Sequence, residues 1–184
     1  RSIDLSQRLY QTIRSQALRL IIPFMCAGAL GFLLPDVLGG GHTLALQVAS
    51  GGYTFFMLCL LFCVKFVFSM ACFGSGSPGG IFLPLLVLGV LVGGIYIQGV
   101  GTLLPLSNDM LPNFVVLGMA GLFSAIVRAP ITGIVLISEM TGSFRHLLTL
   151  SLVSLLAYLI PDLLKIRPVY EQLLSRLLEK QTPA

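Results

Sequence analysis

One stretch decides how the sequence is to be interpreted: residues 74–84 read GSGSPGGIFLP. Its four glycines leave the backbone free to turn and uncovered by side chains, and an apolar helix is predicted to begin at about Ile81. The first N–H groups of a helix have no partner within it, and the helix dipole places roughly half a positive charge there. Such an end can hold an anion without an arginine and release it readily. The alternative, a glycine-rich kink that lets helices pack closely, stays open at this point.

The apolar segments around this stretch predict helices of two lengths. Membrane-length helices are predicted over residues 17–34, 53–72, 81–100 and 144–164, and shorter ones over 43–50, 113–127 and 130–141. A helix of about 15 residues rises only about 22 Å, whereas the hydrocarbon core is about 30 Å thick. Short helices must therefore end inside the membrane, where free backbone groups are tolerated only within protein or beside a polar cavity. Broken helices of this kind favour a conduit for an ion or solute over a simple membrane anchor.

Composition places the chain in a bilayer. Of its 184 residues, 56% are hydrophobic and 10% are charged, against about 45–50% and about 25% in soluble domains. Eight of the eleven basic residues lie near the two ends, and residues 66–108 contain no Asp, Glu, Lys or Arg. The bases between 165 and 180 predict a cytoplasmic C-terminal end. These values exclude a disordered, fibrous or disulfide-rich protein, and no basic run interleaved with aromatic residues suggests a nucleic-acid partner.

The four cysteines lie inside apolar segments, and Cys59 and Cys63 have the i, i+4 spacing that can bind a metal. No His, Asp or Glu lies near them in the sequence, so we expect small buried apolar side chains instead. We therefore predict no metal site and no cofactor.

Four segments in order along the chain resemble the CLC family of voltage-gated chloride channels and proton/chloride exchangers. The first is the glycine-rich turn GGGHTL at 39–44, and the second is GIFLP at 80–84, which resembles the GxFxP signature of the family. The others lie at 118–141, which includes RAPITG at 128–133, and at 167–170, which reads RPVY. The family's first-half motifs, GSGIP and GREGP with its gating glutamate, match no segment here.

This resemblance implies an all-α, polytopic membrane protein that forms the second, C-terminal half of an inverted-repeat pore over residues 1–184. Residues 1–16 would end a truncated helix, 17–164 would form the membrane helices, and 165–184 would form the last helix and tail on the cytoplasmic side. The implied function is chloride transport, as proton-coupled exchange or passive conduction, by homodimers of complete subunits that include the N-terminal half. The sequence ends at Ala184 shortly after the last predicted helix, which resembles the short prokaryotic form, so we expect the inner membrane of a prokaryotic cell.

The resemblance also assigns site residues. Backbone amides of Ile81 and Phe82 and the hydroxyl of Tyr170 would bind chloride, the transported substrate. The loop of the site would contain Gly79, Gly80 and Pro84. Part of the dimer interface is expected around Ile131, Ile134, Leu148 and Leu152.

Three charged residues in apolar surroundings receive structural interpretations. Arg128 follows a helix end, where the dipole favours a cation. Lys65 is costly in a membrane span unless it pairs or reaches the surface, so we expect structural contacts for it. Glu139 is expected to make packing or capping contacts rather than to lie on a proton path.

Two other functions remain as alternatives. An intramembrane serine hydrolase would need a serine of the 74–84 stretch and His146 as a dyad, and Pro78 argues against it. The other alternative is a half that is structural and non-conducting on its own.

Overall fold

The computed structural model describes residues 10, 15–75, 80–102, 110–142, 144, 146–166 and 168–171. The principal elements within these residues are all helical, which confirms the predicted all-α class. They are α2 (Gln16–Leu33), η1 (Pro35–Val37), α3 (His42–Ala49), α4 (Phe55–Gly74), α5 (Phe82–Gly101), α6 (Leu111–Val127), α7 (Pro130–Thr141) and α8 (Leu147–Leu163).

The helix ends follow local signals in the sequence. Helix α7 has the predicted bounds because Pro130 suits the first helical position and Gly142 ends the helix with a positive φ of 61°. Helix α8 is shorter than the predicted span over 144–164 and has 17 residues, because the chain still turns at His146, the N-cap. Among the described helices, α4 and α5 are long and apolar enough to cross a membrane.

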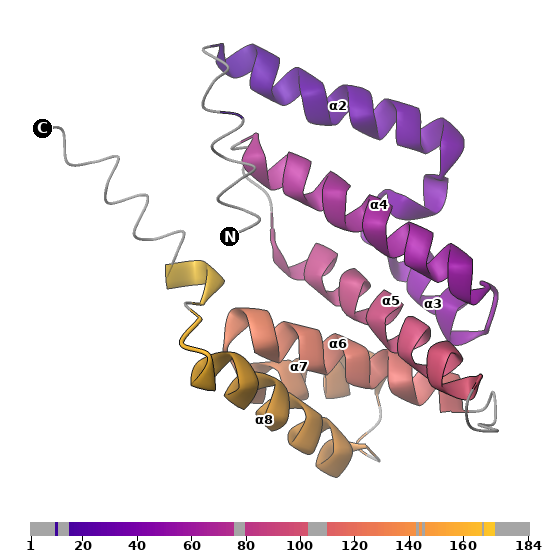
Figure 1. The fold of residues 1–184 in the computed structure, drawn as a ribbon, viewed down its shortest axis with the longest axis vertical. Coiled ribbons are helices and arrows are strands. Elements are labelled where there is room, and N and C mark those ends of the chain that lie inside the picture. Colours follow the sequence, from indigo (N-terminus) through magenta and orange to yellow (C-terminus); the bar gives the residue numbers. More distant parts are fainter. Residues whose placement is uncertain are drawn as a thin grey trace, which may run out of the picture.

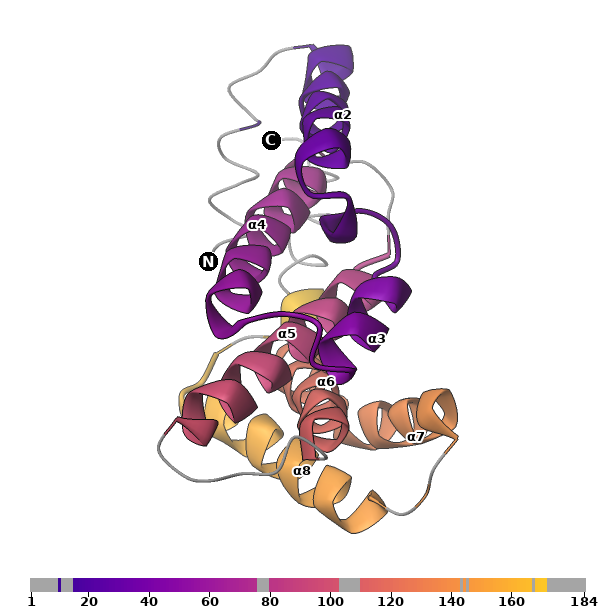
Figure 2. The same cartoon turned by 90° about the vertical axis from the view of Figure 1, so that its right-hand side faces the viewer.

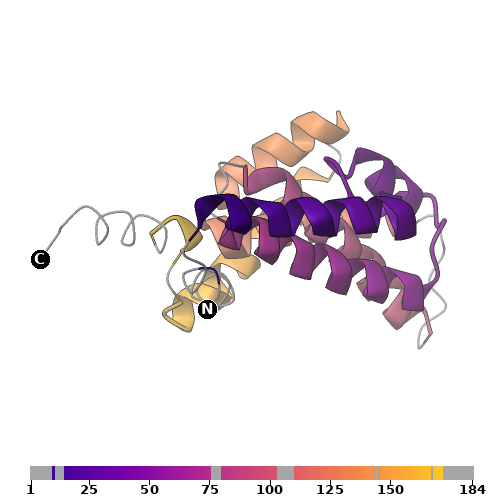
Figure 3. The ribbon, with the colours of Figure 1, turned by 90° about the horizontal axis from the view of Figure 1, so that it is seen from above.

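The helices form a stack with α5 and α6 at its centre. Figure 1 shows α2 at one end, then α4, α5 and α6, and α8 at the other end. Figure 2 shows α3 against the middle of the stack and α7 beside α6 at the end near α8. Seen from above, α2 runs alongside α4 (Figure 3). Because α5 is enclosed by α3, α4 and α6, an unbroken run from Leu85 to Leu91 is buried in it.

The contact between α5 and α6 depends on glycine. A Cβ atom added at Gly93 would lie 2.2 Å from the carbonyl oxygen of Phe114, and one at Gly118 would lie 2.3 Å from the carbonyl oxygen of Gly89. The two backbones therefore touch, as small residues allow in membrane helices. Gly89 and Gly93 have the GxxxG spacing that allows two helices to approach closely.

The prediction that the cysteines are buried is wrong. The cysteines are not buried: Cys26 and Cys63 are exposed, and Cys59 and Cys72 are half-buried. Helix α2 lies at one end of the stack and α4 lies next to it, and much of the surface of each helix is exposed. The side chain of Glu139 is exposed on α7, and the packing or capping contacts expected for it stay a prediction.

Candidate functional site

The candidate site is the N-terminal end of α5. Ile81 occupies the N-cap position and Phe82 is the first helical residue, and no described side chain caps this end. The first helical hydrogen bond runs from the Leu85 N–H to the Ile81 carbonyl at 3.2 Å, so the preceding amides have no partner within the helix. Pro84 carries no N–H, which leaves the amides of Ile81, Phe82 and Leu83 as the free donors.

The space in front of this end is open on the side of Gly80. Gly80 is exposed, and a Cβ atom added to it would meet no atom within 4 Å. Gly79, the other predicted loop glycine, lies outside the described residues. The backbone next to the amides of α5 is therefore uncovered at Gly80.

Two neighbouring segments hold the start of α5 in place. The ring of Phe82 packs edge-on against Phe123 of α6, with ring centroids 5.5 Å apart and planes at 77°. On the other side, the glycine-rich turn before α3 contacts the first two turns of α5. A Cβ atom at Gly40 would lie 3.8 Å from a methyl group of Leu83, and one at Gly41 would clash with Val87 at 2.1 Å. Gly41 also has a φ of +75°, so glycine is required there on both counts.

Lys65 of α4 holds the glycine-rich turn before α3 by hydrogen bonds to its backbone. Its side chain is 3% exposed, and its ammonium donates hydrogen bonds to the carbonyl of Val37 and, at 3.4 Å, to the carbonyl of Gly39. These contacts confirm the structural interpretation of Lys65. No carboxylate among the described residues pairs with it, so the two carbonyl dipoles are its described partners.

Tyr170, the predicted hydroxyl donor, lies in a helical turn that follows Pro168. Its side chain is 52% exposed. In Figures 1 and 2 this turn, drawn in yellow, lies on the side of the stack where α5 begins. The rest of the predicted last helix, residues 172–179, lies outside the described residues.

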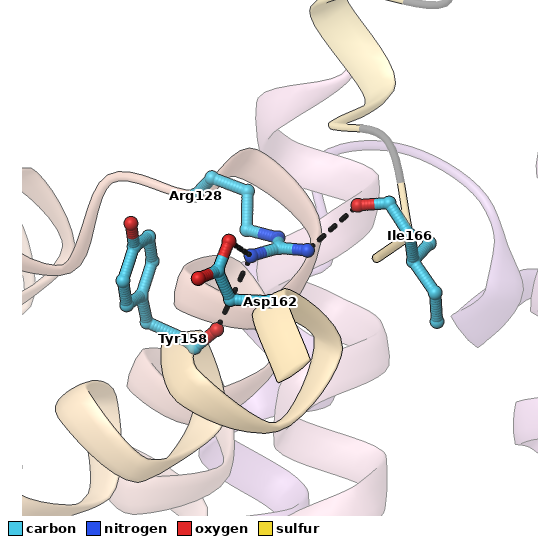
Figure 4. Close-up of polar contacts among 4 residues, drawn as sticks. All are labelled: Arg128, Tyr158, Asp162 and Ile166. Atoms are coloured by element: carbon cyan, nitrogen blue, oxygen red, sulfur yellow. Dashed lines mark hydrogen bonds and ion pairs between the residues drawn. The ribbon is translucent and has the colours of Figure 1, made fainter. Parts of the chain in front are cut away.

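A polar cluster connects the end of α6 with the segment that leads to Tyr170 (Figure 4). Arg128 donates hydrogen bonds to the carbonyl oxygens of Tyr158 at 3.3 Å and Ile166 at 2.7 Å and to Oδ1 of Asp162 at 3.1 Å. Its guanidinium also lies 5.6 Å from the centre of the Tyr158 ring, within range of a cation–π contact. The structural role predicted for Arg128 is confirmed, but its partners on α8 were not foreseen.

The predicted interface residues do not all share one environment. Ile131 and Leu148 are both 76% exposed and Leu152 is 55% exposed, which leaves apolar surface on α7 and α8 uncovered. Ile134 instead packs partly buried against the core, because it lies on the inner side of α7.

The serine-hydrolase alternative gains no support. The hydroxyl of Ser75 donates to the carbonyl of Cys72 at 2.7 Å, and His146 is the N-cap of α8. Ser77 lies outside the described residues. The described residues also contain no group of three His, Cys, Asp or Glu side chains that is able to hold a metal ion.

Comparisons with known proteins point in one direction. A family model described as voltage gated chloride channel matches residues 1–162. The H(+)/Cl(-) exchange transporter ClcA of Vibrio parahaemolyticus is 43% identical over 164 residues, which cover 87% of this chain and 35% of the relative. ClcA of Salmonella arizonae is 38% identical over 154 residues, which cover 84% of this chain and 33% of the relative.

A solved structure agrees. This chain superimposes on the crystal structure of a slow cyanobacterial Cl-/H+ antiporter with a TM-score of 0.81 and 31% sequence identity. The matched region covers 98% of this chain and 43% of the antiporter chain. The chain thus spans about a third of the length of the curated relatives it matches.

Proposed function

Because the chain belongs to the voltage-gated chloride channel family, we propose that it is the second half of a pore that transports chloride across a membrane. In this proposal the amides of Ile81 and Phe82 and the hydroxyl of Tyr170 bind the anion, and Gly79, Gly80 and Pro84 shape the loop around them. The uncapped start of α5 is the observation that carries it, since free amide donors there need an acceptor.

The chemistry of this site suits rapid transport. Amide dipoles and one hydroxyl attract an anion in a low-dielectric environment without a full positive charge, so the ion is bound and then released. Pro84 contributes by removing one donor from the first turn, which confines the free amides to the end of the helix. The packing of Phe82 against Phe123 keeps these amides in one position.

Proton-coupled exchange is the form of transport that we favour over passive conduction. The relatives from Vibrio and Salmonella are named H(+)/Cl(-) exchange transporters, and the solved structure is named a Cl-/H+ antiporter. We infer that the complete subunit includes an N-terminal half that supplies the remaining pore wall, and that the chain on its own does not conduct.

Pairing of complete subunits would cover the exposed apolar surface on α7 and α8. Ile131, Leu148 and Leu152 offer the most surface for this contact, and Ile134 would support it from beneath. A prokaryotic inner membrane with the C-terminal end in the cytoplasm is the proposed location.

The test uses the complete protein reconstituted in liposomes, with chloride efflux and calorimetric chloride binding as readouts. Tyr170→Phe should weaken chloride binding by about tenfold, since hydrogen bonds to charged groups contribute about 1.5–3 kcal/mol. The matched control is Tyr96→Phe, which removes a hydroxyl from an exposed ring that stacks on Phe114 and should change neither readout. Equal chloride affinity in the Tyr170→Phe variant and the wild type would overturn the assignment of the hydroxyl.

A further inference from the structure

Arg128 lies at an unusual point of the backbone. It ends α6 with a φ of 64°, in the left-handed region, which non-glycine residues rarely adopt. The next helix, α7, ends in the same conformation with Gly142, the residue that this conformation ordinarily favours. An arginine at such a position indicates that its side chain provides contacts that glycine cannot.

Those contacts span the end of α8. Tyr158 and Asp162 belong to the last two turns of α8, and Ile166 lies three residues beyond its end. The side chain of Arg128 is 8% exposed, whereas that of Asp162 is 60% exposed. The carboxylate is therefore largely exposed, whereas the hydrogen bond to the Tyr158 carbonyl is partly buried and the one to the Ile166 carbonyl is exposed.

The chain leaves α8 through a closed turn that Arg128 completes. The Ile166 N–H donates to the Pro161 carbonyl at 3.0 Å and the Lys165 N–H donates to the Asp162 carbonyl at 2.9 Å, with Lys165 at a φ of 51°. This is the Schellman arrangement of a helix end. Because the carbonyl of Ile166 is held by Arg128 as well, both polar groups of Ile166 are fixed (Figure 4).

We propose that Arg128 is a positioning residue for Tyr170. Only three residues separate Ile166 from Tyr170, and one of them is Pro168, whose ring fixes its φ. A segment this short transmits a displacement of Ile166 to the tyrosine hydroxyl, and a hydrogen bond weakens steeply when its distance and angle change. The inference rests on the proposed role of Tyr170 in chloride binding.

A double-mutant cycle in the complete protein tests this coupling. Calorimetric chloride affinity is measured for the wild type, Arg128→Gln, Tyr170→Phe and the double variant. Arg128→Gln alone should weaken binding by about fivefold, a loss within the range found for coupled neighbours, and should cause no further loss in the Tyr170→Phe background. Additive losses would overturn the proposal, because Arg128 would then act independently of the hydroxyl.

Two variants separate positioning from general stability. Asp162→Asn removes the carboxylate charge but leaves both backbone carbonyls, and should bind chloride like the wild type. Arg128→Lys keeps the charge but cannot reach three acceptors at once, so it should restore only part of the lost affinity. If Arg128→Gln fails to fold, Arg128→Lys takes its place in the cycle with the same criterion of additivity.

A measurement without chloride distinguishes failure of this inference from failure of the proposed function. The native cysteines of the complete protein are first replaced, and Tyr170→Cys is then introduced. The rate at which a thiol reagent labels this cysteine is compared between a protein that keeps Arg128 and one that carries Arg128→Gln. A severalfold change in the labelling rate supports positioning even if chloride binds elsewhere. An unchanged rate would refute it, whatever the chloride affinity of the wild type.

Discussion

Replacing Gly93 by alanine should separate α5 from α6 and disturb the proposed anion site at the start of α5. The added Cβ atom would lie 2.2 Å from the Phe114 carbonyl oxygen and 2.9 Å from the Cα atom of Val115, both of which are backbone atoms. Because backbone cannot rotate away as a side chain can, the helices must move apart by about 1 Å before the contact becomes ordinary.

The expected change in the free energy of unfolding follows from two opposing effects. Overpacking of this kind costs about 1–3 kcal/mol, while alanine gains about 1 kcal/mol over glycine from helix propensity. We expect a net loss of up to about 2 kcal/mol in the free energy of unfolding at Gly93. The amides of Ile81 and Phe82 would shift with α5, which should weaken chloride binding by about tenfold.

The assay compares Gly93→Ala with Gly101→Ala in the complete protein. Gly101 ends the same helix, and a Cβ atom there meets nothing within 4 Å, so the control should unfold at the wild-type temperature or slightly above it. Thermal unfolding in detergent and calorimetric chloride binding are the two readouts. If Gly93→Ala matches Gly101→Ala in both, the backbone contact does not position α5 and the reasoning is refuted.

Three further predictions concern the elements around α5. Ile81→Pro removes one amide donor, and the backbone φ of −74° at this position is one that proline accepts. Chloride affinity should therefore fall in Ile81→Pro and stay unchanged in the control Ile81→Val. Equal affinities in the two variants would exclude the Ile81 amide as a donor. Lys65→Met leaves the Val37 and Gly39 carbonyls without their donor and should destabilise the protein by about 1–3 kcal/mol, with Lys65→Arg closer to the wild type in thermal unfolding. Burial and the hydrogen bond to Asp36 raise the pKa of Tyr53 from 10.0 to about 12, so its stabilisation is complete below pH 10 and is lost as the pH rises through about 12. Tyr53→Phe should flatten that part of the stability profile, and an unchanged slope would show that another group causes it.

The helices and the free amides at the start of α5 were predictable because their signals are local. Pro130 and Gly142 mark the ends of α7 by backbone preferences that operate within one turn. The glycines before Ile81 mark the start of α5 in the same way, and free amides follow from any helix start.

Contacts between distant segments were less predictable. The partners of Lys65 lie 26 and 28 residues away in the chain, and those of Arg128 lie 30 to 38 residues away. Nothing in the local sequence specifies which carbonyl a buried cation meets. The outward exposure of Cys26 and Cys63 was missed for the same reason, since the composition of an apolar helix does not reveal which side its neighbours cover.

The sequence by itself determined that this protein is helical, belongs in a membrane and has a helix start with free amide donors after a glycine-rich stretch. These properties depend on composition, on helix length against bilayer thickness and on glycine and proline within a few residues. Only the tertiary structure decided that α5 is held against α6 by touching backbones, that Lys65 supports the glycine-rich turn, and that Arg128 holds the segment before Tyr170. Each of these depends on distances across the fold, which short-range backbone preferences do not specify.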